Sequence, residues 1–391
     1  MKGYELLAPV GNFAMLYAAI DSGCDAVYFG IKGLNMRESA RNFELKDLAK
    51  IKKICEPDEI KKYLTINTIV YDSELSKIER IIKKAKDYVD AIICWDLSVI
   101  SLCNKYKVPF HVSTQASVSN TSSAELFKKL GAERIVLARE LSLKQIGLIS
   151  KAIDVECFCH GAMCVSVSGR CFISQFLHGL SANRGKCAQP CRRAWNVKDD
   201  KGNKLKLENN RVMSPKDLCT LPFIEDMKKA GIVSYKIEGR NRSVEYVSTV
   251  VRVYRKALDN KLSQKEIKEC VEELKKVYNR GLSSGFYLGV PTNDDFSNSE
   301  NGEQTEIKEY VGKVEKYWPK VGAASLRMHA GELKVGDEIY LICKDEAIKR
   351  VEIESIEFEG KNVKSTKKGE EVGVKLPKVR RGTDVYVIKK K

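Results

Sequence analysis

Residues 155–191 read VECFCHGAMCVSVSGRCFISQFLHGLSANRGKCAQPC. The stretch begins with one of a series of predicted strands and continues into a cysteine-rich segment that interrupts the series. The first six letters predict a short buried strand, because apolar residues gather there between turn signals. Seven similar runs occur, at 5–8, 26–30, 64–70, 91–95, 110–115, 134–138 and 234–238. Amphipathic segments that predict helices lie between them, at 13–22, 45–55, 73–88, 122–130 and 143–152.

This alternation of strands with helices is typical of an α/β protein, and we predict a (β/α)8 TIM-like barrel. A doubly wound open sheet is the alternative, although no G-x-G-x-x-G follows the first strand. Between the predicted seventh and eighth strands, a cysteine-rich insertion at about 161–233 replaces a single helix. Long insertions of this kind usually carry function.

The pattern changes after the eighth strand. Helices are expected at 244–260 and 264–279, followed by a polar stretch that predicts a linker at 291–306. From 307 to 391, short alternating runs such as DEIYLIC and EVGVKL predict a small all-β barrel. We therefore expect a catalytic domain at 1–290, the linker, and a C-terminal β-barrel domain.

The crowding of cysteines needs a chemical reason. Six of the chain's 13 cysteines fall within residues 157–191, and Cys219 follows. The start MKGYELLAPVG has no signal-peptide pattern, and no apolar run reaches membrane-spanning length, so we expect a cytoplasmic protein without a membrane partner. Thiols stay reduced there, which favours metal binding or thiol chemistry over disulfides. The spacing favours an iron–sulfur site over zinc and leaves the absence of a metal open.

Charge bears on the partner. The formal net charge is +16, with a pI of about 9.1. Residues 170–216 hold eleven Lys or Arg against three Asp or Glu. A basic run beside a metal site suits the phosphates of a nucleic acid, and a solvated basic face is the alternative. Arg170 in this run is a candidate substrate-binding residue.

Polar residues at every second position of the predicted strands indicate side chains that face into the barrel. Near the carboxyl ends of the strands, where such barrels place their active sites, this selects Asn67, Gln115, Glu140, His160, Lys236, Glu238 and Arg240. We assign catalytic roles to His160, Glu238, Gln115 and Lys236, and substrate-binding roles to Asn67, Glu140 and Arg240. With this alternation of inward and outward side chains, Cys157 and Cys159 face outward and are expected to be ordinary packing thiols.

Two of these assignments have structural alternatives. His160 either moves a proton or polarises a substrate oxygen, or else it only orients the cysteine loop through a hydrogen bond. Glu238 is either an acid or base, or the ion-pair partner that keeps Lys236 or Arg240 buried.

Several motifs follow one another in an order that resembles peptidase family U32, the collagenase-like family. They are ELLAPVGNFAMLYAAIDSGCDAVYFG, LNMRESARNF, HGAMCVSVSGRC, RGKCAQPCR, SPKDLC and YKIEGRNRSVEYVSTVVRVYRKALD. The family includes proteins that bind a 4Fe–4S cluster and hydroxylate without oxygen, on the wobble uridine of tRNA, a cytidine of 23S rRNA or the ubiquinone ring. For the RNA enzymes the resemblance implies prephenate as the source of the hydroxyl group.

The resemblance also implies residue roles. It carries the cluster ligands to Cys164, Cys171, Cys187 and Cys219, with Cys191 as the alternative for one of them. Arg37 and Arg41 lie in the family-like MRESARNF and could bind a carboxylate or phosphate with two hydrogen bonds each. Surface arginines leading into a helix are the alternative for this pair.

These observations together predict an iron–sulfur enzyme that hydroxylates RNA without molecular oxygen, at C5 of the tRNA wobble uridine. The expected partners are tRNA and a small hydroxyl donor, and no oligomeric state is predicted. The alternatives are a 23S rRNA cytidine or quinone-ring hydroxylase, a collagenase-like peptidase, and a non-catalytic RNA-binding protein with structural zinc. No H-E-x-x-H and no G-x-S-x-G occurs, which disfavours the peptidase.

Overall fold

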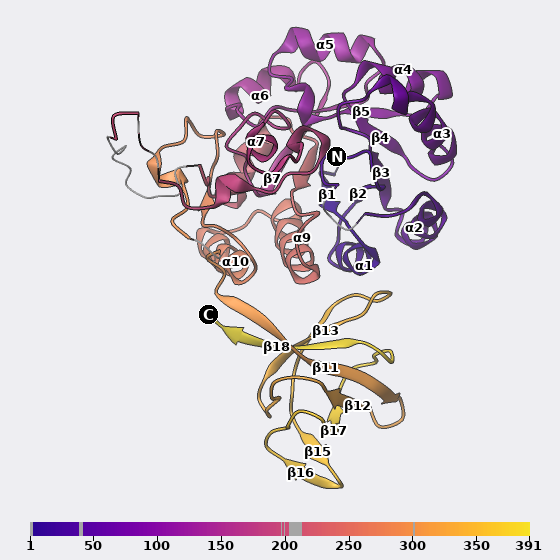
Figure 1. The fold of residues 1–391 in the computed structure, drawn as a ribbon, viewed down its shortest axis with the longest axis vertical. Coiled ribbons are helices and arrows are strands. Elements are labelled where there is room, and N and C mark those ends of the chain that lie inside the picture. The colour runs from indigo at the N-terminus through magenta and orange to yellow at the C-terminus, as the bar shows by residue number, and fades with distance from the viewer. Residues whose placement is uncertain (1–2, 39–41, 197, 199, 203–212, 300–301) are drawn as a thin grey trace.

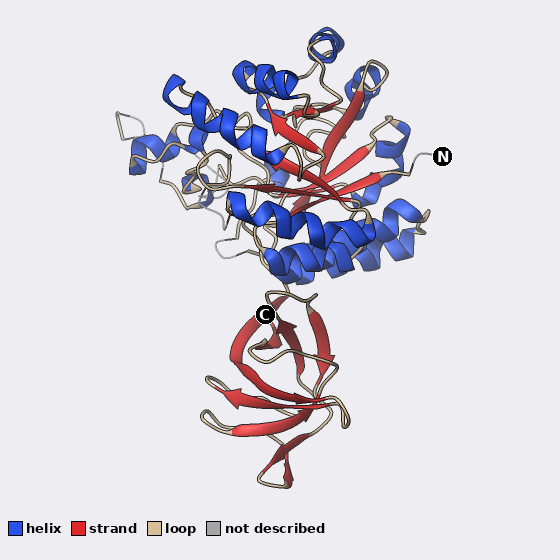
Figure 2. Ribbon diagram, turned by 90° about the vertical axis from the view of Figure 1, so that its right-hand side faces the viewer, coloured by secondary structure: helices blue, strands red, loops and turns tan. Residues whose placement is uncertain are grey.

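A computed structural model describes residues 3–38, 42–196, 198, 200–202, 213–299 and 302–391. It contains a sheet wrapped by helices, formed by the N-terminal part of the chain, and a smaller all-β unit formed by the C-terminal part (Figures 1 and 2). Within the described residues, no helix combines the length and the apolarity needed to cross a bilayer.

Eight parallel strands close into a barrel, which confirms the predicted fold. They are β1 (Glu5–Pro9), β2 (Ala26–Gly30), β3 (Lys61–Thr65), β4 (Ala91–Cys94), β5 (Phe110–Val112), β6 (Arg134–Val136), β7 (Asp154–Gly161) and β9 (Ser234–Ile237). Strands β1 to β7 pair in sequence order, and β9 pairs in parallel with both β7 and β1, so the ring is complete. Two short strands extend the sheet at the insertion: β8 (Asp217–Cys219) runs antiparallel to the end of β7, and β10 (Leu282–Ser283) pairs with β8.

Helices cover the outside of the barrel. They are α1 (Phe13–Asp21), α2 (Leu48–Cys55), α3 (Leu75–Ala85), α4 (Leu97–Tyr106), α5 (Thr121–Lys129), α6 (Leu143–Ile149), α8 (Ile224–Lys229), α9 (Val244–Asp259) and α10 (Gln264–Lys276). Each turns an apolar stripe inward: α3, for example, buries Ile78, Ile81 and Ile82 at helical spacing. The resulting core between helices and strands is separate from a small apolar cluster inside the barrel that includes Leu7 and Tyr28.

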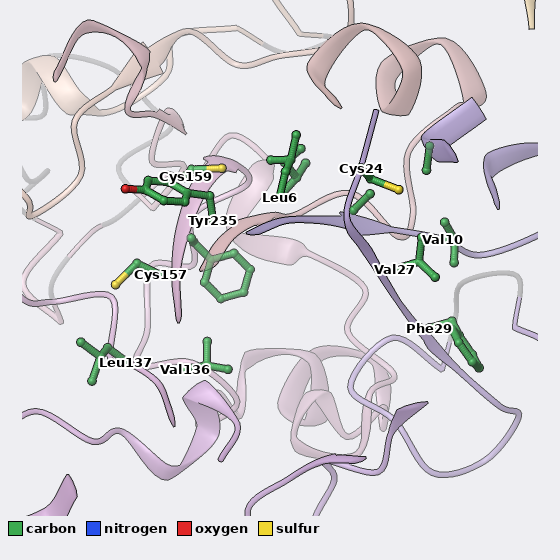
Figure 3. Close-up of a cluster of buried hydrophobic side chains, with 14 of the residues drawn as sticks. Leu6, Val10, Cys24, Val27, Phe29, Val136, Leu137, Cys157, Cys159 and Tyr235 are labelled. Atoms are coloured by element: carbon green, nitrogen blue, oxygen red, sulfur yellow. The ribbon is translucent and has the colours of Figure 1, made fainter. Parts of the chain in front are cut away.

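Cys157 and Cys159 belong to the outer core, as predicted. Figure 3 shows both side chains on β7, with Tyr235 of β9 and Leu6 of β1 among the neighbouring core residues. Burial raises the pKa of both thiols, so neither is a ready thiolate. They are packing residues of the barrel wall.

Two strands end earlier than the alternation predicts. The pattern predicts strands over 64–70 and 110–115, whereas β3 ends at Thr65 and β5 at Val112. After β3 the Asn67 side chain accepts a hydrogen bond from the Met36 backbone N–H at 3.2 Å, and after β5 the chain makes a 3-10 turn at Thr114–Ala116. These contacts replace the hydrogen bonds between neighbouring strands at this level of the barrel. Asn67 and Gln115 therefore lie at the rim of the barrel.

The C-terminal unit is a single antiparallel sheet of β11 (Glu306–Trp318), β12 (Ala323–Met328), β13 (Glu338–Ile342), β14 (Lys349–Glu352), β15 (Ile356–Phe358), β16 (Lys361–Val363), β17 (Glu371–Lys375) and β18 (Asp384–Lys390). The strand order is β14-β13-β18-β11-β12-β17-β15-β16. The sheet curls around one core of its own, which includes Val314, Leu326, Ile339 and Val385. An ion pair of 2.6 Å between Lys308 and Glu245 of α9 ties this unit to the barrel.

The stretch predicted as a linker at 291–306 is partly held against the insertion. The Lys216 backbone N–H donates to the Asp295 carbonyl at 2.8 Å, and the Ser297 N–H donates to the Ser214 carbonyl at 2.7 Å. Strand β11 then begins at Glu306. The segment thus joins the insertion to the C-terminal unit.

Candidate active site at the mouth of the barrel

A cavity of about 60 Å³ lies at the carboxyl ends of the barrel strands. Its lining includes Tyr28, Met36, Arg37, Thr65, Asn67, Ser113, Gln115, Phe158, Lys236, Glu238 and Arg240. Six residues selected from the sequence meet here: Arg37, Asn67, Gln115, Lys236, Glu238 and Arg240. A water needs about 10–15 Å³ by this measure, so the cavity has room for roughly four small groups such as the atoms of a carboxylate.

Amide and hydroxyl groups form one side of the cavity. The Asn67 Nδ2 donates to Ser113 Oγ at 3.2 Å and to Gln115 Oε1 at 3.1 Å. Ser113 in turn donates to Gln115. The Trp95 indole N–H fixes the Asn67 backbone carbonyl at 3.0 Å. This network holds the two amides in fixed positions, where they could orient a polar ring.

Lys236 lies at the floor of the cavity. Its ammonium contacts the Glu156 carboxylate at 2.7 Å and lies 4.4 Å from the centre of the Tyr28 ring. Burial lowers the pKa of Lys236, and the neighbouring Glu156 opposes that shift. Deeper in the barrel Glu156 also meets Arg134, so the interior is filled by a charged network.

Arg37 and Glu238 form an ion pair of 3.1 Å at the rim. Burial alone would raise the pKa of Glu238, but Arg37, Arg242 and Arg139 outweigh it and lower the pKa below its ordinary value. Glu238 is therefore a carboxylate at neutral pH. The sequence offered Lys236 or Arg240 as the ion-pair partner of Glu238, and this prediction is wrong. Lys236 pairs with Glu156, and Arg240 donates to the neutral side chains of Asn35 and Thr65.

Arg240 is held by neutral groups. Its guanidinium donates to Asn35 Oδ1 at 2.9 Å, to Thr65 Oγ1 at 3.2 Å and to Asn42. Burial lowers its pKa to about 10, because none of these three partners carries a charge. Arg240 therefore contributes an uncompensated positive charge to the cavity wall.

Arg139 lies beside the cavity, near Glu238 and Arg37, although it is not part of the lining, and the sequence did not select it. Its guanidinium stacks 3.9 Å from the centre of the Phe158 ring and donates to the Ala162 carbonyl at 2.8 Å. Among the described residues, its Nε and Nη2 have no hydrogen-bond partner, although the residue is only 8% exposed. Glu140, which was selected instead, is exposed on the turn after β6 and does not line the cavity. The sequence signal that could have found Arg139 is its position directly before Glu140, which was predicted to face inward.

His160 lies on the helix side of the barrel wall, which corrects its predicted inward direction. A bulge between Phe158 and His160 shifts the register of β7 against β9, so the strict alternation fails there. The ring packs against Tyr246 and Tyr254 of α9, and burial, helped by Arg242, lowers its pKa to about 3. A catalytic role for His160 remains a prediction from the sequence.

The cysteine-rich insertion covers the barrel mouth. A Cβ at Gly169 would lie 2.8 Å from Gln115 Cγ, and one at Gly185 would lie 2.2 Å from the Asn35 carbonyl oxygen. Both glycines have positive φ, so side chains are disfavoured there on two counts. Arg184 fastens the insertion further through an ion pair with Glu74. The insertion also contains the short helix α7 (Ile173–His178).

Cys164, Cys171, Cys187 and the alternative ligand Cys191 lie in the first part of the insertion. The pKa of Cys191 is raised, first by burial and then by Cys164, Cys187 and Cys171, so these sulfurs lie within electrostatic range of one another. Cys187 Sγ accepts hydrogen bonds from the Gln189 N–H at 3.4 Å and the Ser174 hydroxyl at 3.9 Å.

Cys219 lies apart from these four. It is buried in the outer core, where the Tyr254 hydroxyl donates to its sulfur at 3.7 Å. Over the described residues, no three Cys, His, Asp or Glu side chains converge as ligands of a single metal ion.

The cysteines adjoin the cavity. Cys164 lies within electrostatic range of both Arg37 and Arg139, since its thiolate would favour the charged form of each arginine. Arg170 is exposed on the insertion. Arg41 lies outside the described residues.

The sequence model of peptidase family U32 matches residues 11–297, which include every barrel strand after β1, the cavity lining and the insertion. The chain belongs to peptidase family U32. A collagenase from Porphyromonas gingivalis is 39% identical, over 99% of this chain and 98% of its own length. The tRNA hydroxylation protein P1 of Bacillus subtilis is 35% identical, over 86% of this chain and 83% of its own.

A third U32 relative acts on a different RNA. The 23S rRNA 5-hydroxycytidine C2501 synthase of Escherichia coli is 39% identical over 65% of this chain, which corresponds to 39% of the synthase. Relatives of this U32 chain thus carry names of two kinds, proteolysis and RNA hydroxylation.

Proposed function

We propose that this U32 chain hydroxylates RNA without molecular oxygen, at C5 of the tRNA wobble uridine, with prephenate as the hydroxyl donor. The observation that carries the proposal is the cationic cavity at the barrel mouth, lined by Arg37, Lys236 and Arg240, against which the cysteine-rich insertion packs at Gly169. The names of the Bacillus subtilis and Escherichia coli relatives support hydroxylation of RNA. We place the protein in the cytoplasm, where tRNA is available and thiols stay reduced.

A 4Fe–4S cluster is part of the proposal. Cys164, Cys171 and Cys187 would hold it, with Cys191 as the fourth ligand because Cys191 shares their neighbourhood and Cys219 does not. When bound, such a cluster supplies single-electron transfer.

The reaction exchanges a hydrogen for a hydroxyl. Replacing C5–H by C5–OH oxidises the base by two electrons, so a donor R–OH that becomes R–H accepts the same two electrons and the reaction balances. The residues of this chain bind and orient the two reactants. Arg37 and Arg139 bind the acid groups of the donor, while Asn67 and Gln115 present amides to its ring.

The charges of the cavity favour a doubly negative donor. Three cations, Arg37, Lys236 and Arg240, line the cavity against one carboxylate, Glu238, so the lining carries an excess of two positive charges. Prephenate carries two carboxylates and matches this excess. The cavity admits one acid group and has no room for the ring of the donor or for a whole base, so the rest of the donor and the uridine would lie on the side of the insertion.

A second cavity supports an RNA partner. It measures about 740 Å³ and lies between the barrel and the C-terminal unit, with Arg242, Lys308 and Lys344 in its wall. Basic side chains in a groove of this size suit a phosphate backbone.

The test uses protein purified without oxygen. We expect about four iron and four sulfide per chain, and conversion of uridine to 5-hydroxyuridine in an unmodified tRNA transcript when prephenate is present. Omission of prephenate should abolish the product. Iron-replete protein that leaves the transcript unchanged would refute the proposal.

Peptidase activity is the second candidate, favoured by the name of the Porphyromonas gingivalis relative. The pair of Cys219 and His160, which lie opposite each other on β8 and β7, argues against it: burial raises the pKa of Cys219 and lowers that of His160, which is the reverse of an activated thiolate pair. Digestion of denatured collagen that disappears in a Cys164→Ser variant would revive this candidate.

A further inference from the structure

The insertion exposes an unusual set of apolar side chains. Phe176 is 84% exposed and Phe172 is 59% exposed, and both belong to the α7 region. Val165, Val167, Leu177 and Leu180 are also exposed, so six large apolar residues within one short segment contact solvent. Soluble domains seldom expose contiguous apolar surface without a binding role.

The two phenylalanines lie side by side. Their ring centroids are 6.3 Å apart, and the ring planes are inclined by 39°. Folding buries neither ring, so the core of the insertion does not account for them. Flat aromatic faces open to solvent are what proteins use to stack the bases of single-stranded nucleic acids.

The positive charge of the same segment favours a negatively charged ligand. Between residues 157 and 198 there are six Lys or Arg and no Asp or Glu. Arg170 is exposed two residues before Phe172, and Lys186 is exposed ten residues after Phe176. Bare aromatic rings within an acid-free basic segment complement a nucleic acid, which presents base faces and phosphates together.

The position of the rings points to single strands near the reaction site. Gly169, three residues before Phe172, packs against Gln115 and Met36 of the cavity lining. At about 3.5 Å per residue, Phe172 begins within roughly 10 Å of that contact. A base stacked on these rings would therefore lie at the edge of the barrel mouth, close to the proposed reaction site. This position favours an RNA substrate over a membrane surface as the ligand of the rings.

We propose that Phe172 and Phe176 form a stacking platform for bases of a single-stranded RNA loop, with Arg170 and Lys186 on its phosphates. The inference rests on the proposed function for the choice of RNA, and it names the surface that receives that substrate. The platform binds the nucleotides that flank the reacting base.

Binding of a labelled RNA hairpin with an open loop to the full chain tests the platform. The double variant Phe172→Leu/Phe176→Leu keeps the apolar area but removes the rings, and it should weaken binding at least tenfold, because each stacked base contributes appreciably. The double variant Phe172→Tyr/Phe176→Tyr keeps the rings and should bind within about threefold of the wild type. Leu148→Ala, at an exposed apolar site on α6, is the matched control and should change nothing.

Salt dependence separates stacking from charge. The leucine variant should keep the wild-type slope of affinity against salt, whereas Arg170→Gln/Lys186→Gln should reduce the slope by about two ionic contacts. Equal binding of the hairpin by the leucine variant and the wild type would overturn the proposal. So would phenylalanine-dependent self-association in light scattering, or phenylalanine-dependent binding to anionic lipid vesicles.

The outcome is independent of the proposed reaction. Ring-dependent RNA binding without hydroxylation would leave the platform standing and remove the proposed function. Hydroxylation of tRNA by a leucine variant that binds as tightly as the wild type would do the reverse.

Discussion

Arg139 stacks its guanidinium 3.9 Å from the centre of the Phe158 ring, and among the described residues two of its three nitrogens have no hydrogen-bond partner. A buried cation without a direct ion-pair partner costs free energy of folding, which a binding site can regain when an acid binds. We therefore expect Arg139 to reduce the stability of the free protein and to contribute to binding of an acidic ligand.

Replacing Arg139 should separate stability from function. We expect Arg139→Met to leave the free energy of unfolding unchanged or to raise it by about 1 kcal/mol, because an unpaired buried charge is removed. The same variant should lose most of the hydroxylation activity. Urea unfolding and the RNA assay together measure both effects.

Arg134 provides the matched control. Its side chain is 12% exposed and pairs with Glu5 and Glu156, so Arg134→Met should lower the free energy of unfolding by about 3–5 kcal/mol. Equal destabilisation by the two variants would contradict the distinction between them.

The Arg37–Glu238 pair predicts a shift in the pH profile. Arg37 is the largest of the influences that lower the pKa of Glu238, so Arg37→Gln should raise that pKa. Activity that needs the carboxylate would then be lost at a higher pH than in the wild type, and the acid limb of the rate profile should move upward. Arg37→Lys should restore part of the shift, since it returns the charge without the paired geometry. An unchanged acid limb in Arg37→Gln would show that Glu238 does not need to ionise.

His111 should control part of the stability at mildly acidic pH. Burial and the nearby Arg134 lower its pKa from 6.5 to about 3, so the unfolded chain binds the proton first. The stability that this neutral histidine provides is present above pH 6.5 and is lost as the pH falls towards 3, by about 1.4 kcal/mol per pH unit. His111→Phe keeps the edge contact with Tyr63 and should flatten this dependence. Urea unfolding at a series of pH values measures it, and identical slopes in both proteins would refute the assignment.

Gly185 should be needed to seat the insertion. Its φ is +82°, and a Cβ there would meet the Asn35 carbonyl oxygen at 2.2 Å, so Gly185→Ala should loosen the insertion and reduce activity. Gly202 has a φ of +81° but nothing within 4 Å, so Gly202→Ala carries only the backbone strain. Limited proteolysis of the insertion compares the two variants. Equal protease sensitivity would mean that the close approach to Asn35 does not matter.

Serine variants distinguish the fourth cluster ligand. Cys164→Ser, Cys171→Ser and Cys187→Ser should each lose iron, and we expect Cys191→Ser to lose it as well. Cys219→Ser should keep its iron, because Cys219 lies in the outer core beneath Tyr254. Iron retained by Cys191→Ser and lost by Cys219→Ser would instead support the ligand set that the family resemblance implies.

The barrel was predictable because its signals are local. Buried runs and amphipathic segments alternate along the chain, and parallel strands joined by helices have few closed arrangements. Gln115, Lys236 and Glu238 followed from the same alternation. His160 did not, because a one-residue bulge reverses a side chain without leaving a mark in the sequence pattern.

The ion pairs were less predictable than the strands. The partner of Glu238 is Arg37, 201 residues away in sequence, and no pattern within one strand could select it. Arg139 was missed for a related reason: its position on a turn after β6 falls outside the alternation, and only the packed structure shows that its nitrogens lack partners.

The nucleoside content of cellular tRNA tests the central claim most directly. Cells that lack their own tRNA hydroxylation protein, grown without oxygen, would carry either the wild-type chain or Cys164→Ser. We predict 5-hydroxyuridine in tRNA from the cells with the wild-type chain and none in tRNA from the cells with the variant. Absence of hydroxylated nucleosides in both, from cells whose wild-type chain is folded and contains iron, would contradict the account.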